Sequence, residues 1–282
     1  KDNNKKMEIN PLFMERCLQL ARKGEGFTKP NPLVGAVIVH NGKIIGEGFH
    51  RKYGEGHAEV NAIASVKDSA LLADSTLYVS LEPCAHYGKT PPCAELIITK
   101  GIPRVVVATG DPNPKVSGKG IAMMRENGIE VTVGLLEKEA RDLIRIFFVN
   151  QLYHRPYILL KWAQSSDGFM DYLRIPGDGK SPVIISNTMT HAIVHKFRTK
   201  VQGIMVGTNT ALLDNPRLTA RKWFGDDPVR VVIDRKNKIP ADAFLFDGTV
   251  PTIVFTASAP SHTMKKENVK YIVIDFSGDT NR

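Results

Sequence analysis

No run of about 18 apolar residues occurs in the sequence, so a membrane-spanning helix is not expected. The N-terminal residues 1–10 are polar and lack an apolar core, which argues against a secretory signal peptide. The charged, asparagine-rich residues 1–6 are expected to be a disordered leader or an expression remnant. We therefore predict a cytoplasmic protein with no membrane partner.

The chain has few cysteines, and its positive charges are spread along the sequence without forming a cluster. Three cysteines are too few for a disulfide framework, and in a reducing compartment a spaced pair more often binds metal or does chemistry. The net charge is +9, but the lysines and arginines form no block of five or six. A phosphorylated small molecule is therefore favoured over a nucleic acid as the anionic partner.

The chain has 282 residues, of which 42% are hydrophobic, and it exceeds the usual size of a single hydrophobic core. Two domains are expected, over residues 7–152 and 156–282. The boundary is placed at His154-Arg155-Pro156, where the periodicity is interrupted. The chain stops after a predicted strand, at residues 278–282, so we expect an incomplete second domain from a longer parent chain.

Helical and strand-like patterns alternate in both halves, which predicts α/β domains, the first with a partly parallel sheet. Asn41-Gly42 between two strand-like runs is the strongest hairpin signal in the chain. The predicted helices cover residues 10–23, 57–67, 92–100, 117–127, 136–150 and 188–199. The predicted strands cover residues 33–40, 43–49, 76–80, 104–109, 130–134, 157–162, 203–206, 229–233, 252–255 and 271–274.

The chemistry is carried by the pattern H-x-E at His57 and Glu59, followed by Cys84 and Cys93, each near a predicted helix start. One imidazole and two thiolates give Zn²⁺ three protein ligands and leave a fourth position for water, as in catalytic zinc sites. Helix N-termini favour the thiolate forms. Glu59 is placed to take a proton from that water and hand it to a departing amine. This is the signature of zinc nucleotide deaminases, in which a metal-activated hydroxide attacks a ring carbon.

Taken singly, these residues have ordinary structural interpretations. A histidine at the start of a helix is usually a surface residue that caps the helix or a residue of the hydrophobic core. Two cysteines separated by eight residues are unremarkable in isolation. Their occurrence together and in this order favours the zinc deaminase, although the common signature has two residues between the cysteines. The longer loop between the cysteines must fold back so that both sulfurs reach one metal ion. It also brings His86 and Lys89 beside the metal site. Cys17 lies on the apolar face of the first helix, where core packing is expected.

Four strings carry a family resemblance: PNPLVGAVIV (30–39), HAEVNAI (57–63), LEPCAHYGKTPPC (81–93) and DPNPKVSGKG (111–120). They resemble the bifunctional deaminase/reductase family of riboflavin biosynthesis, in which the long loop between the cysteines is typical. The resemblance covers the whole first domain and implies a three-layer, cytidine-deaminase-like fold. It also implies zinc-dependent deamination of 2,5-diamino-6-ribosylamino-4(3H)-pyrimidinone 5′-phosphate, followed by reduction of the ribosyl group to ribityl with NADPH.

The same resemblance implies roles in the first domain. His57, Cys84 and Cys93 would bind zinc, and Glu59 would shuttle protons. Amide, carboxylate and ammonium groups suit a sugar phosphate and a polar ring. The substrate contacts so implied are Asn31, His50, Lys89, Asp111 and Asn113. For the two asparagines and the aspartate, formation of a turn beside proline is an alternative role.

In the second domain, KWAQSSDGFM (161–170) and residues 198–221 resemble the family's nucleotide and substrate motifs and imply a dihydrofolate-reductase-like fold. Without the resemblance, these residues would be interpreted as a strand end, a helix and a loop, because no G-x-G-x-x-G motif is present. The implied cofactor contacts are Lys161, Gln164, Val183, Thr210 and Asp214. The implied substrate contacts are Ser181, Arg198, Leu218 and Arg221.

The second domain departs from the family in two places. Val183 stands where many members carry a tryptophan, and the late glycine-rich segment that cradles the cofactor phosphates is absent from these 282 residues. A protein that ended at Arg282 would be expected to reduce its substrate weakly or not at all. A deaminase with an inactive second domain is therefore an alternative.

Two further alternatives come from other classes of protein. A nucleic-acid base deaminase, such as a tRNA adenosine deaminase, shares the H-x-E and P-C elements. With 7% aromatic residues and no basic cluster, the chain has little to hold flanking nucleotides. A silent zinc-binding or nucleotide-sensing module would not need Glu59. A homo-oligomer, either dimer or tetramer, is expected from the resemblance.

Overall fold

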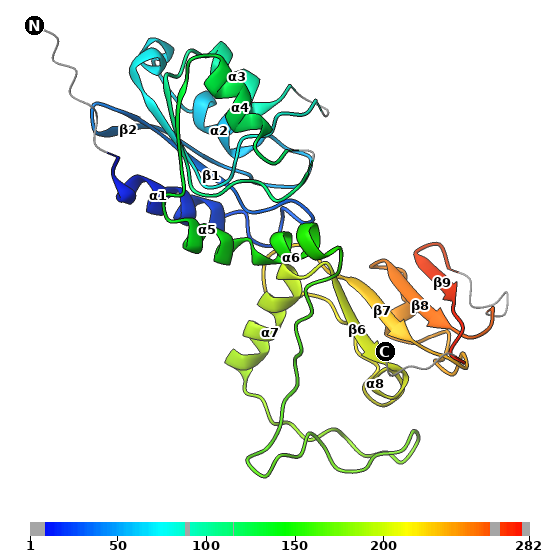
Figure 1. The fold of residues 1–282 in the computed structure, drawn as a ribbon. Helices are drawn as coiled ribbons and strands as arrows, with labels where there is room; N and C mark the ends of the chain where they lie inside the picture. The colour runs from blue at the N-terminus through cyan, green and yellow to red at the C-terminus, as the bar shows by residue number, and fades with distance from the viewer. Residues whose placement is uncertain (1–8, 88–90, 115, 260–265, 278–282) are drawn as a thin grey trace, which may run out of the picture. The chain divides into compact units, whose positions relative to one another are not determined.

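The computed structural model describes residues 9–87, 91–114, 116–259 and 266–277. The chain divides into two compact units, Lys1–Ile158 and Leu159–Arg282 (Figure 1). Each unit has its own β-sheet and its own hydrophobic core. None of the described helices is long and apolar enough to cross a membrane.

The first unit is built on a five-stranded sheet. Its strands are β1 (Gly35–His40), β2 (Lys43–Phe49), β3 (Thr76–Val79), β4 (Arg104–Val107) and β5 (Glu130–Val133). Their order across the sheet is β2-β1-β3-β4-β5, with β1 antiparallel to both neighbours and β3, β4 and β5 parallel. The partly parallel sheet predicted from the sequence is confirmed.

The hairpin between β1 and β2 turns at Asn41-Gly42, as predicted. Both residues have positive φ angles, 48° and 72°. Such a two-residue turn matches the right-handed twist of the flanking strands, and asparagine and glycine tolerate its backbone best. The hairpin fixes the edge of the sheet on which α2 packs.

Helices cover both faces of the first sheet (Figure 1). They are α1 (Pro11–Arg22), α2 (Ala58–Ala64), α3 (Cys93–Thr99), α4 (Lys119–Glu126) and α5 (Glu137–Leu143). Residues of α2, α3 and α4 pack with Ile38, Leu77 and Val105 on one face. Residues of α1 and α5 pack with Val37 and its neighbours on the other, because successive strand residues point to opposite faces. The predicted three-layer architecture is confirmed.

The helix predicted over residues 136–150 is two helices. α5 ends at Leu143. The next residue, Ile144, leaves helical geometry (φ −111°, ψ 26°), and α6 (Arg145–Tyr153) follows directly. Ile144 is buried against Leu81 and Phe148, so tertiary packing redirects the chain there. The prediction of one continuous helix was wrong because periodicity does not show such a redirection. A 3₁₀-helix, η1 (Ser69–Asp74), was not predicted either.

The second unit contains a four-stranded parallel sheet in the order β6-β7-β8-β9. Its elements are α7 (Thr188–Lys200), β6 (Gly203–Gly207), α8 (Thr208–Asp214), β7 (Val229–Ile233), η2 (Phe244–Phe246), β8 (Thr252–Thr256) and β9 (Val269–Val273). Val232 and Val254 of the sheet pack against Leu245 and Phe246 in the core of this unit. The short helix α8, which follows β6 without a loop, was not predicted.

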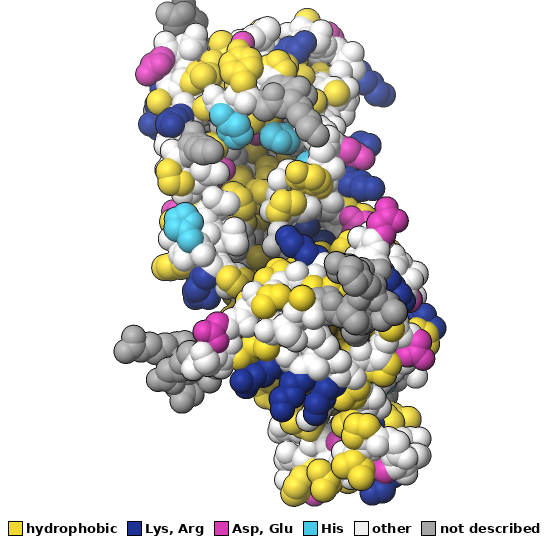
Figure 2. All heavy atoms as spheres, turned by 90° about the vertical axis from the view of Figure 1, so that its right-hand side faces the viewer, with side chains coloured by type: hydrophobic (Ala, Val, Ile, Leu, Met, Phe, Trp, Pro, Cys, Tyr) yellow, Lys and Arg dark blue, Asp and Glu magenta, His cyan; other side chains and the backbone are white. Residues whose placement is uncertain are grey.

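Residues 157–187 form neither helix nor strand. The strand predicted at residues 157–162 was therefore wrong. A strand needs a neighbour that pairs with its backbone, and within the described residues β6 pairs only with β7. Apolar side chains such as Leu160 and Ile184 consequently stay exposed. Figure 2 shows hydrophobic side chains at the lower end of the molecule, where Figure 1 places this segment.

A glycine allows α1 to cross closely over β1. A Cβ added at Gly35 would lie 2.0 Å from the carbonyl oxygen of Cys17 and 2.8 Å from the backbone nitrogen of Ala21. We expect Gly35→Ala to lower the free energy of unfolding by about 1–3 kcal/mol, because it displaces α1 from the sheet. Thermal unfolding followed by circular dichroism measures this. Gly207→Ala, whose added Cβ meets nothing within 4 Å, is the control, and an equal loss in both variants would contradict the prediction.

Candidate active site

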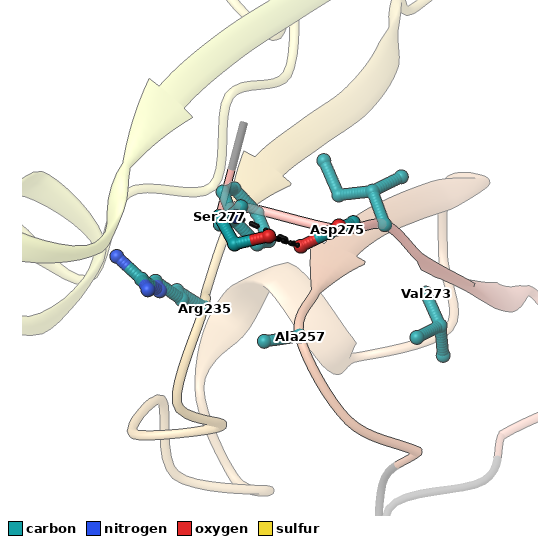
Figure 3. Close-up of a pocket in the computed structure, with 7 residues that line it drawn as sticks. Arg235, Ala257, Val273, Asp275 and Ser277 are labelled. Carbon is teal, nitrogen blue, oxygen red and sulfur yellow. Dashed lines mark hydrogen bonds between the residues drawn. The ribbon is translucent and has the colours of Figure 1, made fainter. Parts of the chain in front are cut away.

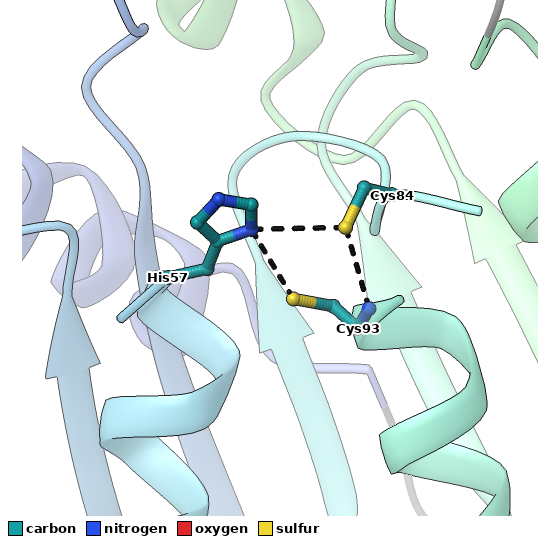
Figure 4. Close-up of side chains that lie close together, drawn as sticks. All are labelled: His57, Cys84 and Cys93. Carbon is teal, nitrogen blue, oxygen red and sulfur yellow. Dashed lines mark hydrogen bonds between the residues drawn. The ribbon is translucent and has the colours of Figure 1, made fainter. Parts of the chain in front are cut away.

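Three potential metal ligands converge where elements of the first unit begin or end. His57 is the N-cap of α2, Cys84 lies in the loop after β3, and Cys93 is the first residue of α3. His57 Nδ1 lies 3.7 Å from Cys84 Sγ and 3.3 Å from Cys93 Sγ, and all three ligand atoms lie within 4.8 Å of one another. Figure 4 shows the three side chains pointing toward a common centre.

These distances fit a zinc ion. With Zn–S bonds of about 2.3 Å and Zn–N bonds of about 2.0 Å, tetrahedral geometry places nitrogen and sulfur about 3.5 Å apart. The two observed N···S distances, 3.3 and 3.7 Å, lie on either side of that value. Three protein ligands leave the fourth position of a tetrahedral ion for water or substrate, as in catalytic zinc sites.

The electrostatics of the two thiols also point to a cation. Hydrogen bonding with Cys93 and with His57 lowers the pKa of Cys84 to about 4, and the contact with Cys84 raises the pKa of Cys93. The backbone N–H of Cys93 donates to Cys84 Sγ at 3.3 Å, so the start of α3 also stabilises the thiolate. A cation between the sulfurs would allow both to ionise, since metal binding displaces thiol protons.

Glu59 lies in the first turn of α2 and is only 3% exposed. Burial raises its pKa to about 7, while the nearby charge of His57 acts in the opposite direction. The carboxyl group also interacts with Cys93. A carboxyl group that titrates near neutral pH can both accept and donate a proton under working conditions.

Asn31 and His50 lie beside His57. His50 Nδ1 is 3.2 Å from the carbonyl oxygen of Gly56, which can only accept, so Nδ1 carries the proton. Nε2 then accepts from Asn31 Nδ2 at 3.2 Å. Burial lowers the pKa of His50, which keeps the ring neutral. The rings of His50 and His57 meet edge to face with centroids 5.6 Å apart.

Asp111 lies near Cys84, and Asn113 is joined to Asp111. Asp111 Oδ1 accepts a hydrogen bond from the backbone N–H of Asn113 at 2.8 Å, so the turn role considered from the sequence is present. Burial raises the pKa of Asp111, and the charges of His86 and Cys84 act on it, which shows their proximity. Lys89, the remaining expected contact, lies outside the described residues.

In the second unit, two of the expected substrate residues meet. Arg198 Nη1 donates to the carbonyl oxygen of Thr219 at 2.8 Å, and Arg221 Nη1 donates to Thr219 Oγ1 at 3.4 Å. Among the described residues, the buried Nε of Arg198 has no hydrogen-bond partner. Burial and the charge of Arg221 lower the pKa of Arg198, so an anion here would relieve repulsion. The side chain of Leu218 is buried in the core, which leaves its backbone for contact with a ligand.

Three of the expected cofactor residues gather around α8. Asp171 accepts a hydrogen bond from the N–H of Val183 and pairs with Arg174, which also pairs with Asp214 at 2.6 Å. Thr210 is exposed on the same helix. The described residues show no hydrogen bond between α8 and the exposed Lys161 and Gln164, which are expected cofactor contacts, or Ser181, which is an expected substrate contact.

A pocket that the sequence did not predict lies past the carboxyl ends of β7, β8 and β9. Its volume is about 390 Å³, and its lining includes Arg235, Ala257, Asp275 and Ser277 (Figure 3). This edge of a parallel sheet is the usual position of ligand sites in α/β proteins. The available signal was Arg235 soon after β7 and the pair Asp275 and Ser277 soon after β9, which carries little information without the strand order.

Comparisons with known proteins cover both halves of the chain. Residues 7–109 match the cytidine and deoxycytidylate deaminase zinc-binding region, and residues 156–279 match the RibD C-terminal domain. The riboflavin biosynthesis protein RibD of Aquifex aeolicus is 45% identical over 265 residues, which are 93% of this chain and 70% of that protein. The chain belongs to the RibD family. RibD of Bacillus amyloliquefaciens is 46% identical over 277 residues, 97% of this chain and 72% of that protein.

A solved RibD-type structure supports the same assignment. It is a diaminohydroxyphosphoribosylaminopyrimidine deaminase/5-amino-6-(5-phosphoribosylamino)uracil reductase from Thermotoga maritima, with a TM-score of 0.83 and 42% identity. The match covers 95% of this chain and 74% of that one. The family resemblance, the α/β fold class and the enzymatic character predicted from the sequence are confirmed. RibD matches over both halves do not favour the nucleic-acid deaminase or the deaminase-only protein.

The zinc content of cysteine variants tests the metal site. We expect Cys84→Ser to lose most of the zinc, because serine lacks the soft thiolate that the ion prefers. Cys17→Ala should keep it, since Cys17 lies on the buried face of α1 and its thiol donates to the carbonyl oxygen of Tyr78 at 3.3 Å. Elemental analysis after purification without chelators measures both. Full zinc in Cys84→Ser would show that the ion is held elsewhere.

Proposed function

We propose that this RibD-family chain deaminates 2,5-diamino-6-ribosylamino-4(3H)-pyrimidinone 5′-phosphate with zinc and then reduces the ribosyl group to ribityl with NADPH. The observation that carries the proposal is the convergence of His57, Cys84 and Cys93 beside the buried Glu59. The match to the RibD C-terminal domain supports the second step. His57, Cys84 and Cys93 would be the zinc ligands and Glu59 the catalytic acid and base.

Deamination exchanges an amino group of the ring for the oxygen of water. Zinc, when bound, supplies a Lewis acid that makes a water molecule acidic near neutral pH. Glu59 would take one proton from the attacking water and pass it to the departing amino group, which would leave as ammonia while the water oxygen stays on the ring carbon. A buried carboxyl group with a pKa of about 7 suits both transfers. Water and the pyrimidine are the only reactants, and no oxidant is needed.

The residues on either side of Glu59 would orient the substrate. Asn31 donates its amide N–H to His50, which leaves its Oδ1 to accept a hydrogen bond from the pyrimidine. Asp111 and Asn113 would contact the substrate from the side of Cys84. Lys89 would bind the phosphate.

Replacement of Glu59 separates proton transfer from metal binding. We expect Glu59→Gln to slow ammonia release by about 10²–10⁴-fold, because an amide cannot shuttle a proton. Its zinc content should stay unchanged. Ammonia release under anaerobic conditions and elemental analysis measure the two effects. Glu15→Gln, on the exposed face of α1, is the matched control, and a fully active Glu59→Gln would refute the assigned role.

In the reduction, NADPH would transfer a hydride to the sugar. Arg198 and Arg221 would bind the substrate phosphate, since two neighbouring guanidinium groups suit a dianion. The remaining substrate contacts would be Ser181 and the backbone of Leu218. The NADPH contacts would be Lys161, Gln164, Val183, Thr210 and Asp214. Because the charge of Asp214 is paired with a buried arginine, Asp214 would meet an uncharged part of the cofactor.

Loss of one arginine should affect only the reduction. We expect Arg221→Gln to raise the KM of the reductase substrate by about tenfold while ammonia release stays unchanged, because a charge-assisted contact to phosphate is removed. NADPH absorbance follows the reaction. Lys236→Gln removes an exposed charge after β7 and serves as the control. A KM equal to that of the unmodified protein would remove Arg221 from the site.

A deaminase with an inactive second domain is the alternative considered from the sequence, and the match of residues 156–279 to the RibD C-terminal domain does not favour it. Ammonia release without NADPH consumption would identify this protein. The homo-oligomer, dimer or tetramer, and the cytoplasmic location stay predictions from the sequence.

A further inference from the structure

Glu82 is a buried carboxylate that the zinc chemistry does not use, and it is only 4% exposed. Its Oε2 accepts hydrogen bonds from the backbone N–H groups of Asp111 at 3.1 Å and Gly118 at 3.0 Å. Its Oε1 accepts from the N–H groups of Gly120 at 3.1 Å and Ile121 at 3.3 Å. One side chain therefore binds four backbone donors from a segment about thirty to forty residues further along the chain.

These four donors come from one loop and from the helix that follows it. Asp111 lies in the loop after β4, Gly118 ends that loop as the N-cap of α4, and Gly120 and Ile121 lie in the first turn of α4. The first N–H groups of a helix have no partner inside the helix and carry partial positive charge. Gly118 has a positive φ of 75° and no side chain with which to cap α4. Glu82 thus acts as the cap of α4 and closes the loop at the same time.

A close backbone contact joins the same two segments. A Cβ added at Gly120 would lie only 2.0 Å from the carbonyl oxygen of Pro83. The first turn of α4 therefore rests directly on the peptide between Glu82 and Cys84. The segment that provides a zinc ligand and the segment that provides Asp111 are held together by the Glu82 carboxylate and by this contact.

We propose that Glu82 is a positioning residue for deamination, which holds the described part of the loop before α4, residues 111–114 and 116–118, against the segment that carries Cys84. By fixing this loop it places Asp111 and Asn113 at the pyrimidine ring, and in this respect the inference rests on the proposed function. Only a carboxylate fits, because all four neighbours are donors. An amide would accept at one end and turn its own N–H groups toward two donors at the other.

The kinetic test uses Glu82→Gln in the full chain. We expect the KM for the diaminopyrimidinone phosphate to rise by at least about tenfold with kcat changed by less than about threefold, because contacts to the bound substrate are lost while proton transfer is kept. The zinc content should equal that of the unmodified protein. Glu126→Gln, the same exchange at the exposed end of α4, should change none of these values.

Hydrogen exchange of the unmodified protein tests the anchor without a variant. The amides of Asp111, Gly118, Gly120 and Ile121 should be protected, although three of them lie at or beside the open start of a helix. In Glu82→Gln these amides should exchange at least about tenfold faster, and bound substrate should slow them again.

Each negative outcome has its own meaning. If these four amides exchange without protection in the unmodified protein, Glu82 does not anchor the loop, and this conclusion does not depend on the identity of the substrate. An unchanged KM in Glu82→Gln, or loss of zinc in proportion to activity, would overturn the positioning role. If the unmodified, zinc-loaded protein releases no ammonia from this substrate, the proposed function fails, and the exchange measurement alone then decides whether Glu82 anchors the loop.

Discussion

The first unit depends on the compensation of buried negative charge by the N-termini of its helices. The sulfur of Cys84 accepts from the first N–H of α3, and the carboxylate of Glu82 accepts from the first turn of α4. Backbone N–H groups provide partial positive charge in fixed directions without a flexible cationic side chain. The site can therefore hold the thiolate of Cys84 and the carboxylate of Glu82 close together and still present anionic groups to a metal ion.

This arrangement requires helices that approach the sheet closely, which glycine permits. An added Cβ at Gly48 of β2 would lie 2.2 Å from the backbone nitrogen of Ala62, so α2 could not lie where it presents His57 and Glu59. Gly120 has the same function at the start of α4, against the carbonyl of Pro83. Protein interiors transmit such displacements because they are closely packed. The positions of the ligand atoms thus depend on residues that carry no chemistry.

The sequence predicted the features that local spacing determines. The Asn41-Gly42 hairpin, the alternation of strands and helices and the grouping of His57 with the two cysteines all follow from short patterns and agree with the structure. The break at Ile144, the unpaired residues 157–162 and the capping role of Glu82 could not be predicted, because each depends on a partner distant in the chain. A carboxylate before Pro83-Cys84 gives no sign that its four donors begin 29 residues later, at Asp111.

The second unit has the opposite electrostatic problem, because it withdraws arginine side chains from solvent. Arg230 is fully buried but is satisfied by Asp247 and by backbone carbonyl groups, so it serves the fold. Arg198 differs, because burial and Arg221 both disfavour its charge and its Nε has no partner among the described residues. A buried donor left unpaired costs stability unless a ligand satisfies it. The contrast between these two arginines is the physical reason to place an anionic substrate group at Arg198 and not at Arg230.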